Sequence, residues 1–130
     1  MLHLVALLLH EIKRREVLPL HIETPNDRRA ARVAEAVIND PADSRTLEAW
    51  APHAGASPRT LKRFFRAETG LAFGQWRRHV RLIAALELLA RGEPVTQVAL
   101  AVGYESTSAF MEMFREQLGT TPSKYFERSV

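Results

Sequence analysis

Residues 57–66 read Ser57-Pro58-Arg59-Thr60-Leu61-Lys62-Arg63-Phe64-Phe65-Arg66, and this stretch predicts a helix with a well-defined start. A serine can cap the free backbone N–H groups, and a proline is tolerated at the first helical position because its missing N–H has no partner there. Leu61 and Phe65 lie four residues apart and share one face, while cations occupy the other. An apolar back and a cationic front fit the DNA major groove, although a solvated amphipathic helix is the commoner origin of such a pattern.

The positive charge of the chain is concentrated around this stretch. The whole chain of 130 residues carries a net charge of only +3, which is weak evidence for an anionic partner. Between residues 57 and 82, however, seven Arg and Lys residues oppose a single acid, Glu68, which leaves this segment at +6. Such a local excess favours a polyanion such as nucleic acid as the partner.

The composition argues against several other classes of protein. The chain has no cysteine, which excludes a disulfide framework and a thiolate metal site and fits the cytoplasm. The five histidines lack the spacing of a helical metal site, and the acidic residues form no obvious acid/base couple. The apolar run at residues 4–9 is too short to cross a membrane. We therefore expect no enzyme activity, no cofactor, no metal and no membrane partner.

Residues 1–23 differ in character from the rest of the chain. Residues 1–16 form an amphipathic segment that predicts a helix, and residues 17–23 contain Pro19 and indicate an extended linker. We interpret residues 1–23 as the remnant of a preceding sensor or dimerisation domain, which would make the chain a fragment of a longer protein. A terminal helix packed on its own domain is an equal alternative.

Residues 24–130 predict only helices. Thr24 can cap a first helix that runs to Asn39. Its inward-facing apolar residues are expected to be Val33, Ala34, Val37 and Ile38. The further predicted helices are residues 47–54, 57–69, 73–90, 95–102 and 106–118, and a short last one from Thr121 through Phe126. Pro52 should bend or shorten the helix at residues 47–54 after about Trp50.

The chain contains one pattern twice, and this repeat is its most specific feature. Ala51-x-x-x-Gly55 corresponds to Ala99-x-x-x-Gly103, 48 residues later. Leu61, Phe65, Gly70 and Trp76 correspond to Phe110, Phe114, Gly119 and Tyr125, 49 residues later. The alanine lets two helices approach, and the glycine makes the turn because it tolerates positive φ. The pattern is that of a helix-turn-helix unit, whose second helix enters the major groove. The residues expected in the core are Trp50, Leu61, Phe65, Trp76, Phe110, Phe114 and Tyr125.

In these motifs the sequence resembles the DNA-binding domain of the AraC/XylS family of bacterial transcription regulators, over residues 34–126. The motifs that carry the resemblance are Ser57-Pro58-Arg59-Thr60-Leu61-x-Arg63-x-Phe65, Glu68-Thr69-Gly70, Ala99-x-x-x-Gly103-Tyr104-x-Ser106 and Ser108-Ala109-Phe110-x-x-x-Phe114-Arg115-x-x-x-Gly119-x-x-Pro122. The resemblance implies an all-α fold in which two helix-turn-helix subdomains are joined by a long central helix. The first unit would span residues 24–72, the linking helix 73–91 and the second unit 93–130.

The resemblance also implies how the domain meets DNA. Recognition helices at residues 57–69 and 106–118 would enter successive major grooves on one DNA face, about one turn (~34 Å) apart. The residues expected at base edges are Arg59, Lys62 and Arg63 in the first unit and Thr107, Ser108, Met111 and Glu112 in the second. The residues expected at phosphates are Ser57, Arg66, Arg77, Arg78, Arg81, Ser106 and Arg115.

The second recognition helix departs from the family pattern. Glu112 stands where the family usually has a basic residue, and residues 105–118 hold three acids against Arg115 alone, a net charge of −2. This charge is unfavourable near phosphate, although a glutamate can accept a hydrogen bond from cytosine N4. We expect either that the second unit binds weakly or that Glu112 pairs with a neighbouring arginine.

These features predict a sequence-specific regulator that binds double-stranded DNA, as an activator by family habit. RNA polymerase is an expected partner, and a homodimer through the N-terminal segment or a missing domain stays open. The alternative is a protein-interaction module or an antagonist that retained the fold, with weak or single-unit DNA binding. The acidic second recognition helix motivates this alternative.

Overall fold

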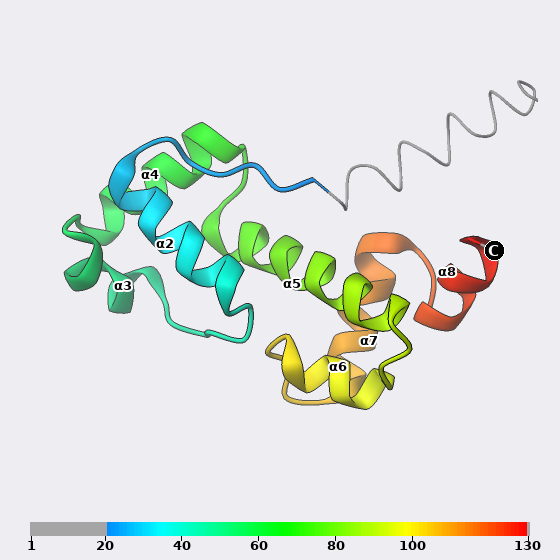
Figure 1. Cartoon of the computed structure of the whole chain (residues 1–130). Coiled ribbons are helices and arrows are strands. Elements are labelled where there is room, and N and C mark those ends of the chain that lie inside the picture. Colours follow the sequence, from blue (N-terminus) through cyan, green and yellow to red (C-terminus); the bar gives the residue numbers. More distant parts are fainter. Residues whose placement is uncertain (1–20, 130) are drawn as a thin grey trace, which may run out of the picture.

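The computed structural model describes residues 21–129, which form seven helices and no strand (Figure 1). The all-α prediction is therefore confirmed for this part of the chain. The helix predicted at residues 1–16 lies outside the described residues. The helices are α2 (Arg28–Asn39), α3 (Leu47–Ala54), α4 (Pro58–Thr69), α5 (Phe73–Ala90), α6 (Val95–Ala101), α7 (Thr107–Leu118) and α8 (Pro122–Ser129).

The repeat in the sequence forms the same local structure twice. The side-chain oxygens of Ser57 and Ser106 each accept a hydrogen bond, at 3.1 Å, from the backbone N–H three residues on, and so cap α4 and α7. Gly70 and Gly119 end these two helices in the left-handed region, with φ of 81° and 76°. The start and end signals read from the sequence therefore operate in both copies.

The first helix begins later than the sequence indicated. Asp27, and not Thr24, is the N-cap of α2, because its carboxylate accepts the N–H groups of Arg29 and Ala30 at 2.9 and 3.1 Å. The prediction that Ile38 faces inward was wrong, since its side chain is 37% exposed. The buried stripe of α2 consists of Ala30, Val33, Ala34 and Val37, whose spacing of three, four and seven residues leaves Ile38 beside the stripe.

Pro52 does not shorten its helix, which was one of the two predicted effects, because α3 continues to Ala54. Proline removes one helical N–H, whose acceptor here would be the carbonyl of Glu48 in the first turn of the helix. The bonds on either side are intact: Trp50 N–H donates to the Thr46 carbonyl, and the Gly55 N–H to the Ala51 carbonyl, both at 3.0 Å. A helix of eight residues therefore tolerates this one lost bond.

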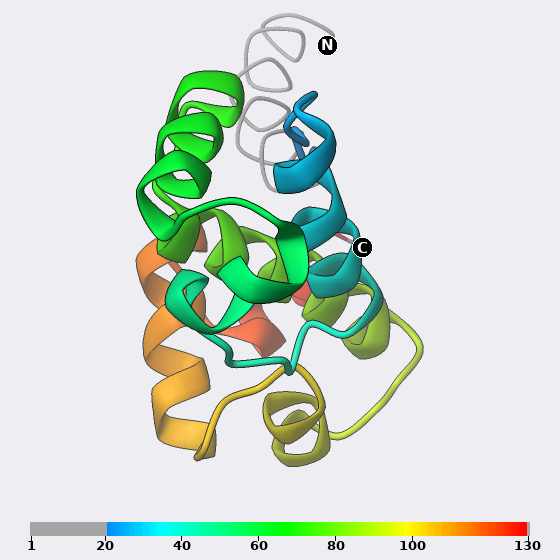
Figure 2. The same cartoon turned by 90° about the vertical axis from the view of Figure 1, so that its left-hand side faces the viewer.

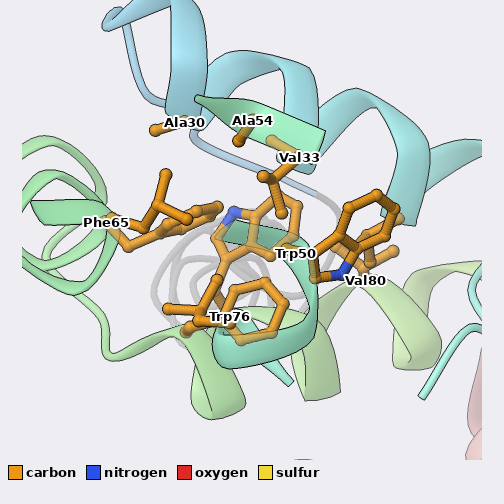
Figure 3. Close-up of a cluster of buried hydrophobic side chains, with 12 residues drawn as sticks. Ala30, Val33, Trp50, Ala54, Phe65, Trp76 and Val80 are labelled. Carbon is orange, nitrogen blue, oxygen red and sulfur yellow. The ribbon is translucent and has the colours of Figure 1, made fainter. Parts of the chain in front are cut away.

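The molecule has two hydrophobic cores that share α5. The first lies among α2, α3, α4 and the beginning of α5 (Figure 3). There Phe65 contacts Phe73 and Trp76, with ring centroids 5.0 and 5.1 Å apart. The second lies among the end of α5, α6, α7 and α8, where Phe114 contacts Phe110 and Tyr125, each with 5.9 Å between ring centroids. The two predicted helix-turn-helix subdomains joined by a long helix are thus confirmed.

The predicted core residues are buried, with one difference of degree. The fully or nearly fully buried ones are Trp50, Leu61, Phe65, Trp76, Phe110 and Phe114. Tyr125 is half-buried and packs at the edge of the second core. Trp76 also ties the preceding segment to the first core, because its indole N–H donates to the Glu23 carbonyl at 2.7 Å.

Replacing Phe65 by Ala should lower the free energy of unfolding by about 3–5 kcal/mol, because a fully buried ring is lost and a cavity remains. Urea denaturation followed by circular dichroism measures this change. The control is Leu100→Ala in α6, whose side chain is 63% exposed and whose loss should cost less than about 0.5 kcal/mol. Equal effects of the two substitutions would contradict the described packing.

Candidate nucleic-acid interface

The outward face of α4 is a single stripe of cations. Arg59, Lys62, Arg63 and Arg66 are all exposed and follow one another at intervals of three, one and three residues, so they lie along one side of the helix. The opposite side, with Leu61 and Phe65, is fully buried and fixes how α4 sits on α2 and α3. The packing of the apolar side therefore decides that the cations face outward.

Most of these cations carry no acidic partner. Lys62 Nζ lies 3.4 Å from Glu48 Oε2, but both side chains are more than 60% exposed, so this pair is weak. The guanidinium of Arg63 lies over the Phe64 ring, 5.2 Å from its centroid. Within residues 21–129, Arg59, Arg63 and Arg66 form no ion pair and remain available to phosphates or base edges.

The outward face of α7 has the same geometry and a different charge. Shifting the stripe of α4 by the 49 residues of the repeat gives Ser108, Met111, Glu112 and Arg115. Three of these side chains are exposed, and Met111 is half-buried, as is Thr107 in the first turn. The structure thus aligns six of the seven residues expected at base edges along two equivalent stripes, with Thr107 beside the second.

Two alternatives were expected for the second unit, and one of them, the pairing of Glu112 with a neighbouring arginine, is not formed in the described part of the chain. In the described part of the chain its carboxylate has no ion-pair partner, and Glu116, one turn further along α7, lies 3.8 Å from Arg78. Since both Arg78 and Glu116 are largely exposed, that contact is loose. The recognition face of α7 therefore presents an unneutralised negative charge.

The two recognition helices lie on the same side of the molecule. In Figure 2, α4 and α7 both run along the left edge of the view, the first above the second, with α5 passing behind them. Because α5 takes part in both cores, it carries both helices on one continuous support.

Two arginines expected at phosphates are bonded to the protein itself. The Arg77 guanidinium donates to the Arg45 carbonyl at 2.6 Å, and its burial, followed by the nearby Arg81 charge, lowers its pKa. Arg81 donates to the Pro41 carbonyl at 2.7 Å and to further acceptors nearby. No sequence signal marked these bonds, because the acceptors are backbone carbonyls some 30–40 residues away. A phosphate contact of either residue stays a prediction.

A basic cleft lies beside the end of α4 and the first half of α5. Its volume is about 580 Å³, and its lining includes Arg66, Arg77, Arg78, Arg81 and Tyr104. Close packing of several guanidinium groups favours an anion there. The hydroxyl of Ser57, which was expected at a phosphate, already donates to the Thr60 hydroxyl at 3.0 Å.

Other kinds of site find no support in residues 21–129. No group of three or more His, Cys, Asp or Glu side chains there could hold a metal ion. None of the helices in the same part of the chain has the length and apolar character needed to span a membrane. The outward stripes of α4 and α7, together with the basic cleft, are the strongest candidate site.

The fold and its two outward-facing helices define the class of protein: a double helix-turn-helix domain, the architecture of proteins that insert helices into the DNA major groove. The family model described as a helix-turn-helix domain matches residues 50–128. Over 125 residues the chain is 36% identical to the transcriptional regulator NimR of Escherichia coli. The aligned region covers 96% of this chain and 46% of NimR. The chain therefore spans less than half the length of this curated relative.

Two solved structures are similar along most of their length. A DNA-binding transcriptional dual regulator from Escherichia coli K-12 matches with 33% identity and a TM-score of 0.69, covering 80% of this chain and 94% of that one. The DNA-binding domain of AdpA in complex with a target DNA matches with the same identity and TM-score, covering 76% and 90%. This chain belongs to the AraC/XylS family, as its motifs predicted, and these relatives are regulators and not enzymes.

The ion pair beside this site should make stability depend on pH. The Arg45 side chain, which donates at 2.6 Å to Asp43, holds the pKa of that carboxyl below its ordinary value, against the opposing effect of burial. The ionised form therefore stabilises the fold above the pKa of the unfolded state, and this contribution is lost as the pH falls through the lower pKa of the folded state.

We expect Asp43→Asn to lower the free energy of unfolding at pH 6 by about 0.5–1.5 kcal/mol, and this difference to shrink as the pH falls below about 4. Urea denaturation across this pH range measures it. Asp40→Asn, in the same loop but with no hydrogen bond or ion pair to its carboxylate in the described structure, should have a smaller effect. A difference for Asp43→Asn that is constant with pH would show that the charge is unimportant.

Proposed function

We propose that this chain is a sequence-specific, double-stranded DNA-binding domain of a transcription regulator. The observation that carries the proposal is the duplicated outward stripe on α4 and α7. These two helices lie on the same side of the molecule (Figure 2). The names of its relatives support it, since NimR is a transcriptional regulator and the AdpA domain is described in complex with a target DNA.

In this proposal α4 and α7, which form the recognition helices at 57–69 and 106–118, enter successive major grooves. Arg59, Lys62 and Arg63 reach base edges, where Arg and Lys pair best with the O6 and N7 acceptors of guanine. Arg66 and Arg115 lie one turn further along each stripe and suit the phosphates that border the groove. The first unit supplies most of the attraction, because the stripe on α7 contains one cation and one unpaired acid.

The regulatory part of the proposal follows from the family. We infer that the regulator acts in the cytoplasm as an activator that contacts RNA polymerase. Dimerisation through residues 1–23 or through a further domain would place two such domains on one DNA site. The curated relative NimR is more than twice as long as the matched region, which leaves room for such a domain in a full-length regulator.

A second candidate function is protein binding with weak or single-unit DNA contact. The unpaired Glu112 on the recognition face of α7 favours it, because a carboxylate facing phosphate is repelled. The dependence of DNA binding on salt separates the two functions. Binding through several phosphates must weaken steeply as salt rises, whereas a protein-binding module would show no DNA binding or a flat response.

Replacing Arg63 by Ala should weaken binding to the selected DNA site by about 1–3 kcal/mol and relax the base preference at one position, because a base-edge contact is lost. Fluorescence anisotropy with the selected site and its single-base variants measures both effects. The charge-matched control is Arg91→Ala at the far end of α5, which should leave the base preference unchanged. If Arg63→Ala kept the full preference, its assignment to base reading would be wrong.

Replacing Glu112 by Gln should strengthen binding to DNA of unrelated sequence at low salt by about 0.2–1 kcal/mol, because a like-charge repulsion is removed from the recognition face. Its control is Glu93→Gln, an exposed acid just before α6 that has no ion pair in the described structure. Weaker binding of Glu112→Gln, confined to sites with a cytosine at one position, would instead assign Glu112 to base reading.

A further inference from the structure

Arg81 lies in the middle of α5, and its guanidinium group joins the two helix-turn-helix units. Toward the first unit, Nε donates to the Pro41 carbonyl at 2.7 Å, and Nη2 donates to the Asp43 carbonyl at 3.2 Å and to Ser44 Oγ at 3.3 Å. Toward the second unit, Nη1 donates to the Gly103 carbonyl at 3.4 Å. One planar side chain therefore has acceptors in both units.

The contact continues from Arg81 to the second recognition helix. The Arg81 guanidinium lies over the ring of Tyr104, 5.4 Å from its centroid. The Tyr104 ring in turn packs on Phe110 with 5.9 Å between ring centroids. Phe110 belongs to α7 and is fully buried. A displacement of the guanidinium would thus be felt by α7 through two ring contacts.

Gly103 forms the turn between α6 and α7 and also leaves room for the Arg81 guanidinium. A Cβ atom at this position would lie 2.7 Å from Arg81 Cζ and 3.0 Å from the Ala42 Cα, so the guanidinium would have to move and the loop to yield slightly. The loop between α2 and α3 therefore meets the turn between α6 and α7 across the guanidinium. Figures 1 and 2 both show this loop and this turn beside each other, below α5.

The contact through Arg81 matters because α5 alone fixes only part of the arrangement of the two helix-turn-helix units relative to each other. A continuous helix sets how far apart the two units lie along its axis. Its continuity does not by itself set the rotation of each unit about that axis, and small sliding of packed helices is a recurrent mode of rearrangement in proteins. A bonded contact between the units, away from the axis of α5, opposes such rocking.

We propose that Arg81 is a positioning residue that fixes the orientation of α7 relative to α4, and thereby the spacing and phasing of the two DNA half-elements that the chain accepts. The orientation follows from the contacts above, whereas its consequence for DNA rests on the proposed function. With four acceptors already on its guanidinium, Arg81 acts through the protein and not as a free phosphate contact.

The chain offers a matched control in Arg77, one turn earlier on α5. Its guanidinium donates to the carbonyls of Arg45 at 2.6 Å and Asp43 at 3.4 Å, which belong to the same loop of the first unit. It has no bond to Gly103 or Tyr104 in the described structure. Arg77→Gln therefore perturbs the loop and removes a charge without breaking the connection between the units.

The first test measures the orientation without DNA. Because the chain has no cysteine, spin labels can be attached at A67C on α4 and Q117C on α7, both exposed positions, in the full chain. Double electron–electron resonance should give a narrow distance distribution for the parent and for Arg77→Gln. Arg81→Gln should broaden or shift it, and so should Arg81→Lys, which keeps the charge but cannot fork to four acceptors.

A distribution for both folded Arg81 variants that superimposes on the parent would overturn the proposal. Circular dichroism confirms folding, and Arg81→Lys serves if Arg81→Gln does not fold. Because this readout requires no DNA, it decides the positioning role even if the chain proves not to bind DNA specifically. In that case the proposed function fails while the orientation result stands on its own.

The second test measures the consequence for DNA. The parent should prefer a site with its selected spacing over one with two base pairs inserted between the half-elements. Arg81→Gln should reduce this preference at least about threefold, since a loose link lowers the effective concentration of the second unit at its half-element. Arg77→Gln should lower the affinity for both sites by the same factor. If Arg81→Gln lowered the affinity for both spacings by the same factor, Arg81 would be a simple phosphate contact, and the positioning role would be contradicted.

Discussion

The structure depends on one constraint: a single helix, α5, must complete two hydrophobic cores. Its early residues Trp76 and Val80 are buried with α2, α3 and α4, and its later residues Leu82 and Leu86 are buried with α6 and α7. Neither unit has enough helices to bury its apolar faces without its share of α5. The recognition helices of both units lie on the same side of the molecule (Figure 2). The basic cleft is lined by residues of α4 and α5 together with Tyr104.

Most of the fold could be predicted because its signals are local. Serine caps, glycine stops and apolar residues four apart act within a few residues of chain, so the bounds of α4, α5 and α7 followed from the sequence. Two predictions about helix bounds failed because a neighbouring group decided the outcome. Thr24 and Asp27 are both capping residues, and the carboxylate of Asp27 forms the hydrogen bonds. Pro52 is a helix breaker, but the hydrogen bonds on either side of it are formed and α3 continues to Ala54.

The candidate site could be predicted only where secondary structure alone decides exposure. Arg59, Lys62 and Arg63 face outward because Leu61 and Phe65 must face inward. The partners of Arg77 and Arg81 were beyond reach, since they are backbone carbonyls brought in by a loop about 35 residues earlier. The same applies to Glu116, which pairs with Arg78 in place of the expected pairing of Glu112. Sequence periodicity predicts on which face of a helix a residue lies, whereas its hydrogen-bond or ion-pair partner depends on tertiary packing.

The two units therefore share a geometry and differ in chemistry, with a cationic stripe on α4 and a nearly neutral one on α7. The most direct test of this account is selection from a randomised DNA library at about physiological salt, followed by sequencing of the bound pool. Two enriched half-elements about one helical turn (~10 bp) apart, the first more strictly conserved than the second, are the predicted result. A pool without any enriched sequence would contradict the account.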